Sequence, residues 1–155
     1  MPTSTKNTKL PPNPFVHEIF EEISKQRSAS KKVEVLKEHR CDAVVSLLIW
    51  NFDDTVVSML PEGTVPYERN DFPVGTDHTS LRKEWRNLYH FVRGGNDSLS
   101  KTRRESMFIQ MLEGLHPHEA DIVCLVKDKS LNSKYKITKA NVEAAYPDIN
   151  WGGRS

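Results

Sequence analysis

Apolar residues recur at helical spacing in two neighbouring segments, residues 101–115 and 117–129. The first segment has one apolar face, formed by Met107, Phe108, Met111, Leu112 and Leu115. The second segment is apolar on almost every side between Ala120 and Val126, which predicts a deeply buried helix. Pro117 cannot lie inside the first helix but suits the first turn of the second. We therefore expect two helices joined at a sharp corner, with the rest of the chain packed around them.

The same reasoning predicts shorter helices elsewhere. Residues 14–26 carry an apolar stripe after an Asn13-Pro14 start, and Ser28 or Ser30 precedes an amphipathic stretch that ends near residue 39. Residues 42–51 are apolar on most sides, which predicts a central helix. We also expect a short helical turn after Asp53-Asp54, a helix over residues 79–95 and a last helix that begins at Thr138.

Three segments lack helical periodicity. Residues 1–13 are polar and proline-rich, which predicts a flexible arm, and residues 151–155 form a short tail whose Trp151 can dock. Residues 61–78 form a long loop that we expect to be pinned by Val65, Tyr67 and Phe72. The predicted fold is all-α: one compact domain over residues 14–150, made of seven or eight short helices.

Composition limits the classes of function that are open to the chain but does not identify a function. The chain has 155 residues, 22 Lys plus Arg and 21 Asp plus Glu, so nucleic acid could bind only to a local basic patch. No apolar run approaches the roughly 20 residues of a membrane span, and no signal peptide is evident, so we expect a cytoplasmic protein. Cys41 and Cys124 lie in apolar runs without a CxxC pair, which favours reduced, buried thiols.

The polar motifs do not form a catalytic or metal-binding set in sequence. His116 and His118 are two residues apart, which on one helix places them on opposite sides, so no metal site is predicted. Asp53-Asp54 is typical of an acidic helix start. Phosphate-binding loops and hydrolase motifs do not occur. We therefore predict no enzyme activity and no cofactor.

Basic residues gather in two places. One group lies on and after the residue 79–95 helix and includes Arg82, Arg86 and Arg103. The other combines lysines with hydroxyl side chains, as phosphate oxygens require, over residues 127–139. Its candidate contacts to nucleic acid are Lys127, Lys129, Ser133, Lys134, Lys136, Thr138 and Lys139.

Parts of the sequence resemble two known protein families. The stretches LPEGTVPY, TSLRKEWRNLYHFVRGGN and RRESMFIQMLEGLHPHEADIVCLVKDKSL resemble a family of short uncharacterised proteins of T-even-like tailed phages. This resemblance covers about half of the chain. It implies an infected bacterial cell as the setting but carries no activity.

The second resemblance is to the N-terminal helical DNA-binding domain of phage-type ATP-dependent DNA ligases. It lies in IFEEISKQRSASKKVEVLKEH and in DIVCLVKDKSLNSKYKITKANVEAAYPDI, where a last helix ends in the pair Tyr146-Pro147. The resemblance implies backbone contacts to DNA around that helix, from Lys129 to Lys139. The ligase KxDG lysine motif is missing, so ligation by this chain is not implied.

These observations favour a non-enzymatic phage accessory protein that binds the phosphate backbone of duplex DNA. The alternative is a protein-interaction module that binds a phage or host protein through the 61–78 loop, with Tyr67, Arg69 and Phe72 as contacts. A minor virion component is a third possibility.

Overall fold

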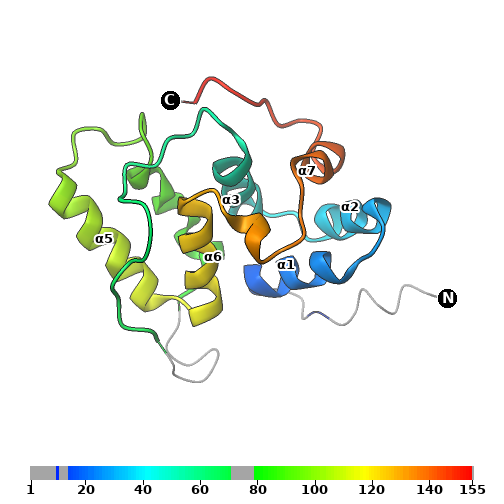
Figure 1. Ribbon diagram of the computed structural model, residues 1–155, viewed down its shortest axis with the longest axis horizontal. Helices are drawn as coiled ribbons and strands as arrows, with labels where there is room; N and C mark the ends of the chain where they lie inside the picture. The colour runs from blue at the N-terminus through cyan, green and yellow to red at the C-terminus, as the bar shows by residue number, and fades with distance from the viewer. Residues whose placement is uncertain (1–9, 11–13, 71–78, 155) are drawn as a thin grey trace.

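The computed structural model describes residue 10, residues 14–70 and residues 79–154. Within these ranges the chain forms seven α-helices, two 3₁₀ helices and no strand, which confirms the predicted all-α class (Figure 1). The α-helices are α1 Val16–Lys25, α2 Ala29–Glu38, α3 Asp42–Phe52, α4 Leu81–Glu84, α5 Lys101–Gly114, α6 Pro117–Lys127 and α7 Lys139–Ala145. The 3₁₀ helices are η2 Trp85–Phe91 and η3 Leu131–Ser133.

Helices α3 and α6 form the centre of the fold, as their apolar sequences predict. Leu47 and Leu48 of α3 and Ile122 and Val123 of α6 are completely buried. Helix α1 packs on α2 and α6, and α2 packs on α7, whereas α5 and η2 lie on the other side of α6 (Figure 1). Burial of each such side chain contributes about 2 kcal/mol, so the α3–α6 contact is a substantial part of the stability of the core.

The corner between α5 and α6 also agrees with the sequence. Pro117 is the first residue of α6, where its missing N–H costs no helical hydrogen bond. His116 is the N-cap of α6, and its Nδ1 accepts a hydrogen bond of 3.0 Å from the backbone N–H of His118. Ser28 caps α2 and Thr138 caps α7 through their hydroxyls, again as predicted.

Helix α1 begins later than expected. The predicted start at Pro14 is wrong, because α1 begins at Val16, and Asn13 lies outside the described residues. The carboxylate of Glu18 accepts the backbone N–H of Phe15 at 2.8 Å, and that of Glu119 in α6 accepts the N–H of Val16 at 2.8 Å. The two carboxylates therefore satisfy the first free N–H groups of α1.

The helical turn predicted after Asp53 is also wrong. The Asp53 carboxylate accepts hydrogen bonds from both the backbone N–H and the hydroxyl of Thr55, which ends α3 in a turn. The chain then runs extended, and Ser58 pairs with Val92 in an isolated antiparallel bridge. The β-branched residues Val56 and Val57 suit this extended path.

The helix predicted over residues 79–95 is shorter and divided. Ser80, not Thr79, is the N-cap of α4, and the Thr79 hydroxyl instead donates to Glu84. Helix α4 tightens into η2 at Trp85, and η2 ends at Phe91 because Val92 is extended in the bridge to Ser58. The pairing of Val92 with Ser58 therefore ends the helix earlier than the apolar pattern of residues 79–95 predicts.

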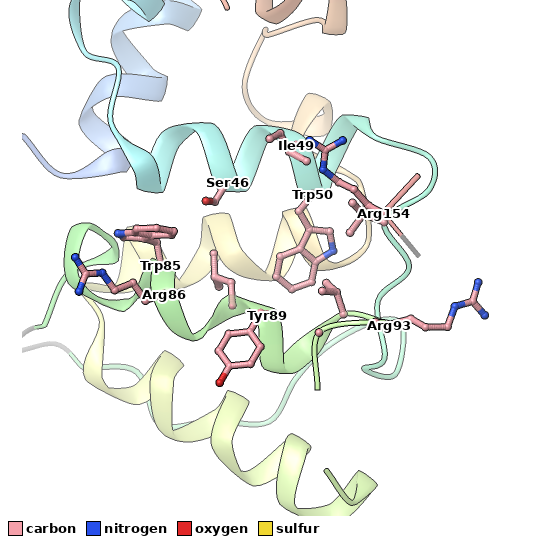
Figure 2. Close-up of a pocket in the computed structure, with 13 residues that line it drawn as sticks. Ser46, Ile49, Trp50, Trp85, Arg86, Tyr89, Arg93 and Arg154 are labelled. Carbon is pink, nitrogen blue, oxygen red and sulfur yellow. The ribbon is translucent and has the colours of Figure 1, made fainter. Parts of the chain in front are cut away.

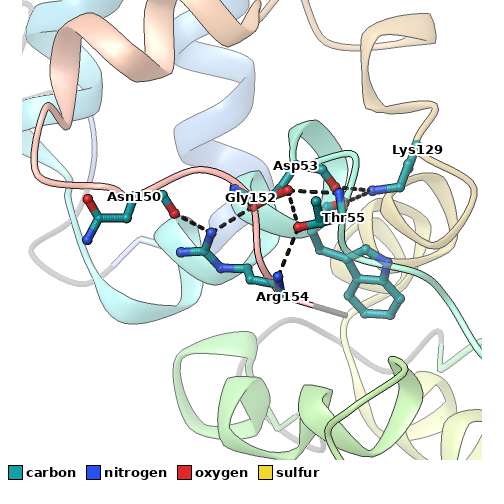
Figure 3. Close-up of polar contacts among 7 residues, drawn as sticks. Asp53, Thr55, Lys129, Asn150, Gly152 and Arg154 are labelled. Carbon is teal, nitrogen blue, oxygen red and sulfur yellow. Dashed lines mark hydrogen bonds and ion pairs between the residues drawn. The ribbon is translucent and has the colours of Figure 1, made fainter.

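The remaining irregular segments are held by side chains. The predicted arm lies outside the described residues except for Leu10, which packs against the core. At the C-terminus, the backbone N–H of Gly152 and the guanidinium of Arg154 both bind Asp53, and Arg154 also donates to Asn150 O (Figure 3). Trp151 is half-buried against the core, which matches the expected docking. In the described ranges, no helix is long and apolar enough to cross a bilayer.

Candidate nucleic-acid interface

Two of the lysines predicted to contact DNA have structural roles instead. Lys127 is only 3% exposed. Its ammonium donates to the carbonyls of Pro61 and Gly63 at 2.7 and 3.1 Å and pairs with Asp128 at 2.7 Å. A buried, neutralised ammonium group cannot reach a phosphate, so the assignment of Lys127 to the interface is corrected.

Lys129 adopts the left-handed conformation, with φ at 55°, just after the end of α6. The N–H groups of Lys129 and Ser130 bond back to Val126 O and Leu125 O, which forms a Schellman motif. The Lys129 ammonium donates to Trp50 O at 2.6 Å and Asp53 O at 2.8 Å (Figure 3). Lys129 therefore closes the C-terminal end of α3, and it too is removed from the predicted interface.

The hydroxyl groups of Ser133 and Thr138, both in the predicted set, differ in whether a hydrogen remains to donate to a phosphate oxygen. The Ser133 hydroxyl donates to Ser130 O at 2.7 Å, which uses its single hydrogen. The Thr138 hydroxyl accepts from the N–H of Asn141, so its hydrogen remains available for a phosphate oxygen. Thr138 therefore stays a candidate contact, and Ser133 does not.

Lys136 lines a groove that the sequence did not reveal, whereas Lys134 and Lys139 are exposed on the same segment but do not line it. The groove has a volume of about 810 Å³ and lies between the end of α1, the start of α2 and the segment from Asn132 to Asn141. Four of its lining residues are cationic and none is acidic. The cations are Lys25, Arg27, Lys32 and Lys136.

The Lys32 ammonium holds the walls of the groove together. It donates to Ile23 O in α1 at 3.2 Å and to Lys136 O at 2.8 Å. The Ser24 hydroxyl accepts the backbone N–H of Lys136 at 2.9 Å and fixes the same contact. Burial, together with the charge of Lys136, lowers the pKa of Lys32.

The other cations in and around the groove form no ion pairs with the described residues, although the Glu22 carboxylate bonds to Gln26, which lines the groove. No carboxylate among the described residues lies within ion-pair distance of Lys25, Arg27, Lys134 or Lys136. The Lys139 ammonium lies 4.9 Å from the centre of the Trp151 ring, a cation–π contact that leaves its charge in place. The groove is therefore a local positive surface on a nearly neutral protein.

Sequence reasoning missed Lys25, Arg27 and Lys32 because they lie about 110 residues before Lys136 in the chain. A sequence window detects only charges that are close in sequence. The one available signal was the run from Lys25 to Lys32, which carries basic residues next to a helix cap.

The residues of the alternative, protein-binding prediction are placed differently. Tyr67 is half-buried and packs against the core, and Arg69 pairs with Asp121 at 2.8 Å. Phe72 lies outside the described residues. Residues 61–70 rest on α5 and α6 through the Lys127 contacts and a hydrogen bond from Glu68 N to Glu113.

A second hollow of about 490 Å³ lies between α3 and η2 (Figure 2). Trp50, Trp85 and Tyr89 contribute aromatic rings to it, and Arg86 and Arg93 lie at its edge. The Trp50 indole N–H is buried and has no hydrogen-bond acceptor in the described chain. This pocket shares no lining residue with the basic groove.

The histidines also lie differently from the prediction. His116 precedes α6 as its N-cap, so the argument that the helix keeps His116 and His118 apart is wrong. Their rings are 5.1 Å apart, and the ring of His17 from α1 lies 4.7 Å from His116 and 5.0 Å from His118.

Comparison with curated proteins and with solved structures finds no match. A family model does match residues 19–133, which span most of the helical domain. The chain therefore belongs to DUF6433, a family of unknown function.

Proposed function

We propose that this protein is a non-enzymatic phage accessory protein that binds the phosphate backbone of duplex DNA through the basic groove. The observation that carries the proposal is the lining of the groove, which has four cations from two distant segments and no carboxylate. Such a surface attracts a polyanion without reading its sequence. The phage setting and the ligase-like use of this region follow from the sequence resemblances alone.

The proposed contacts combine predicted and newly found residues. Lys136 and Thr138 remain from the prediction as lining residues, and Lys25 and Arg27 join them from the end of α1 and the segment after it. Lys134 and Lys139 remain as exposed lysines of the same segment as Lys136. The net charge of +1 offers little attraction beyond the groove. Affinity should therefore be modest, with dissociation constants of about 1–100 µM at physiological salt.

Fluorescence anisotropy with a labelled duplex at low salt tests the proposal. The informative variant replaces both Lys25 and Lys136 with Glu, and the matched control replaces Lys101 and Arg103, which are exposed on α5. Each double variant replaces two cationic residues with Glu, so both variants lower the net charge by the same amount. We expect the groove variant to lose binding and the control to keep most of it.

Two results would reject DNA binding through the groove. One is no binding below about 100 µM at low salt. The other is an equal loss in both variants, which would indicate attraction by overall charge. If DNA binding fails and a protein partner is instead captured in a complex that survives nuclease and high salt, the protein-interaction alternative gains support.

A further inference from the structure

Three histidines from two parts of the chain meet where α1 crosses the α5–α6 corner. One ring nitrogen of His17, His116 and His118 lies within 4.8 Å of a ring nitrogen of each of the others. The rings of His17 and His116 are stacked, and His118 lies edge-on to both. Three imidazoles that converge in this way would repel one another if they were protonated.

Among the three histidines, His17 has a buried ring nitrogen that lacks a hydrogen-bond partner in the described chain. Its side chain is 8% exposed, and the unpaired nitrogen is Nδ1. A buried polar atom left unpaired costs about 1–3 kcal/mol, and a ligand bound to that nitrogen would offset this cost. Burial, followed by His116 and His118, lowers the pKa of His17.

The Nδ1 atom of His116 is a hydrogen-bond acceptor at the corner. It accepts the N–H of His118, so in this arrangement Nδ1 carries no proton. Coordination through Nδ1 would exchange this hydrogen bond, worth about 1 kcal/mol, for a metal bond. The ring of Phe15 lies 5.7 Å from His17 and 5.5 Å from His116 and provides an apolar wall.

We infer that His17, His116 and His118 form a binding site for a divalent transition-metal ion of the zinc type. Neutral imidazoles are preferred ligands of Zn²⁺, Ni²⁺ and Cu²⁺, whereas Mg²⁺ and Ca²⁺ require oxygen ligands. Three histidines leave a fourth tetrahedral position for water or another ligand. Ligand nitrogens in such a site are about 3.4 Å apart, so the rings must close by roughly an ångström, and exposed His118 can move to do so.

A bound ion would join α1 to the α5–α6 corner. His17 lies in the first turn of α1, and the other two ligands flank the start of α6. A metal that binds only the folded chain stabilises it in proportion to the logarithm of its concentration. This inference does not depend on DNA binding, since none of the three histidines lines the basic groove.

Isothermal titration of the tag-free, chelator-treated chain with Zn²⁺ tests the site, and Co²⁺ absorption reports its geometry. We expect one ion per chain, the strong visible absorption of four-coordinate cobalt, and a higher melting temperature with Zn²⁺. His118→Ala alters an exposed side chain and should weaken binding about tenfold or more without unfolding the protein. His39→Ala, which changes a histidine of α2's C-terminal end outside the cluster, should bind as the wild type does.

Two outcomes would overturn the inference. The first is no stoichiometric binding of Zn²⁺, Ni²⁺ or Co²⁺ tighter than about 100 µM. The second is equal affinity in the His118→Ala and His39→Ala variants, which would assign the ion to other residues. Failure of the wild-type chain to bind DNA would leave both metal readouts unchanged, so the two proposals can fail separately.

Discussion

The carboxylate of Glu119 accepts a hydrogen bond of 2.8 Å from the backbone N–H of Val16, a residue 103 positions earlier in the chain. Its other oxygen accepts the N–H of Leu81 at 3.0 Å. One completely buried side chain in α6 therefore serves the first N–H groups of both α1 and α4. Burial raises the pKa of Glu119, and the two backbone hydrogen bonds oppose that rise.

We predict that Glu119→Gln destabilises the fold by about 1–3 kcal/mol. The amide nitrogen that replaces one oxygen is a donor, so it would face a backbone N–H that is also a donor. Urea unfolding measures the change. Glu143→Gln, an exposed substitution on α7, is the control and should alter the free energy of unfolding by less than about 0.5 kcal/mol. Equal stability of the two variants would contradict the capping role.

Lys129 provides a second test of a structural assignment. Because its ammonium holds two carbonyls at the end of α3, Lys129→Ala should cost about 1–3 kcal/mol. Lys134→Ala removes an exposed lysine and should change the free energy of unfolding by no more than about 0.5 kcal/mol. Chemical denaturation followed by circular dichroism compares them. If Lys129→Ala left stability intact while weakening DNA binding, the assignment from sequence would be restored.

We predict that low pH releases the C-terminal segment because the Asp53 carboxylate becomes protonated. Burial tends to raise the pKa of this carboxyl, but hydrogen bonds from Thr55, Gly152 and Arg154 outweigh burial and lower it (Figure 3). In the folded state the depressed pKa means fewer bound protons than in the unfolded state. The stability that Asp53 contributes is therefore fully present above about pH 4 and is lost as pH falls below it.

The measurement is the free energy of unfolding between pH 3 and pH 7 for the wild type and for Asp53→Asn. We expect Asn to cost about 3 kcal/mol at pH 7, since it leaves the Arg154 charge without its partner. The difference between the two proteins should shrink as pH falls toward 3. A difference that is independent of pH would show that the charge of Asp53 is not what stabilises the segment.

The elements that the sequence predicts well are those whose signals are local. Pro117 and the apolar run after it define α6, and the hydroxyls of Ser28 and Thr138 mark the starts of α2 and α7. Each of these signals acts within four residues of the element that it specifies. This explains why the fold class and most helices could be predicted.

The parts that could not be predicted depend on contacts between distant segments. The end of η2 at Phe91 follows from pairing between Ser58 and Val92, and α1 begins where Glu119 meets it. Lys127 resembles a surface lysine in sequence, and only the fold shows that carbonyls of residues 61–63 surround it. For the same reason His17 could not be joined to His116 and His118 before the crossing of α1 and α6 was known.

Tyr146 tests the packing that forms one side of the groove. Its hydroxyl donates at 2.6 Å to Leu36 O, one of the last carbonyls of α2, which lacks a partner within that helix. Tyr146→Phe removes this hydrogen bond inside a completely buried contact and should cost about 1–2 kcal/mol. Thermal unfolding measures the loss. No loss would mean that the α2–α7 contact rests on apolar packing alone.

A comparison of Lys32 with Lys136 distinguishes residues that shape the groove from residues that contact DNA. The Lys32 ammonium is committed to Ile23 O and Lys136 O, so it positions the walls, whereas the Lys136 ammonium faces outward without an ion pair. If DNA binds as proposed, Lys136→Met should reduce the magnitude of the salt slope, d log K/d log [salt], by about one. Lys32→Met should weaken binding at every salt concentration by a few-fold, as the walls separate, with the slope unchanged. Anisotropy titrations at several salt concentrations measure both slopes. An equal reduction of the slope in both variants would mean that Lys32 also neutralises a phosphate, and its hydrogen bonds to the two carbonyls would then have to break when DNA binds.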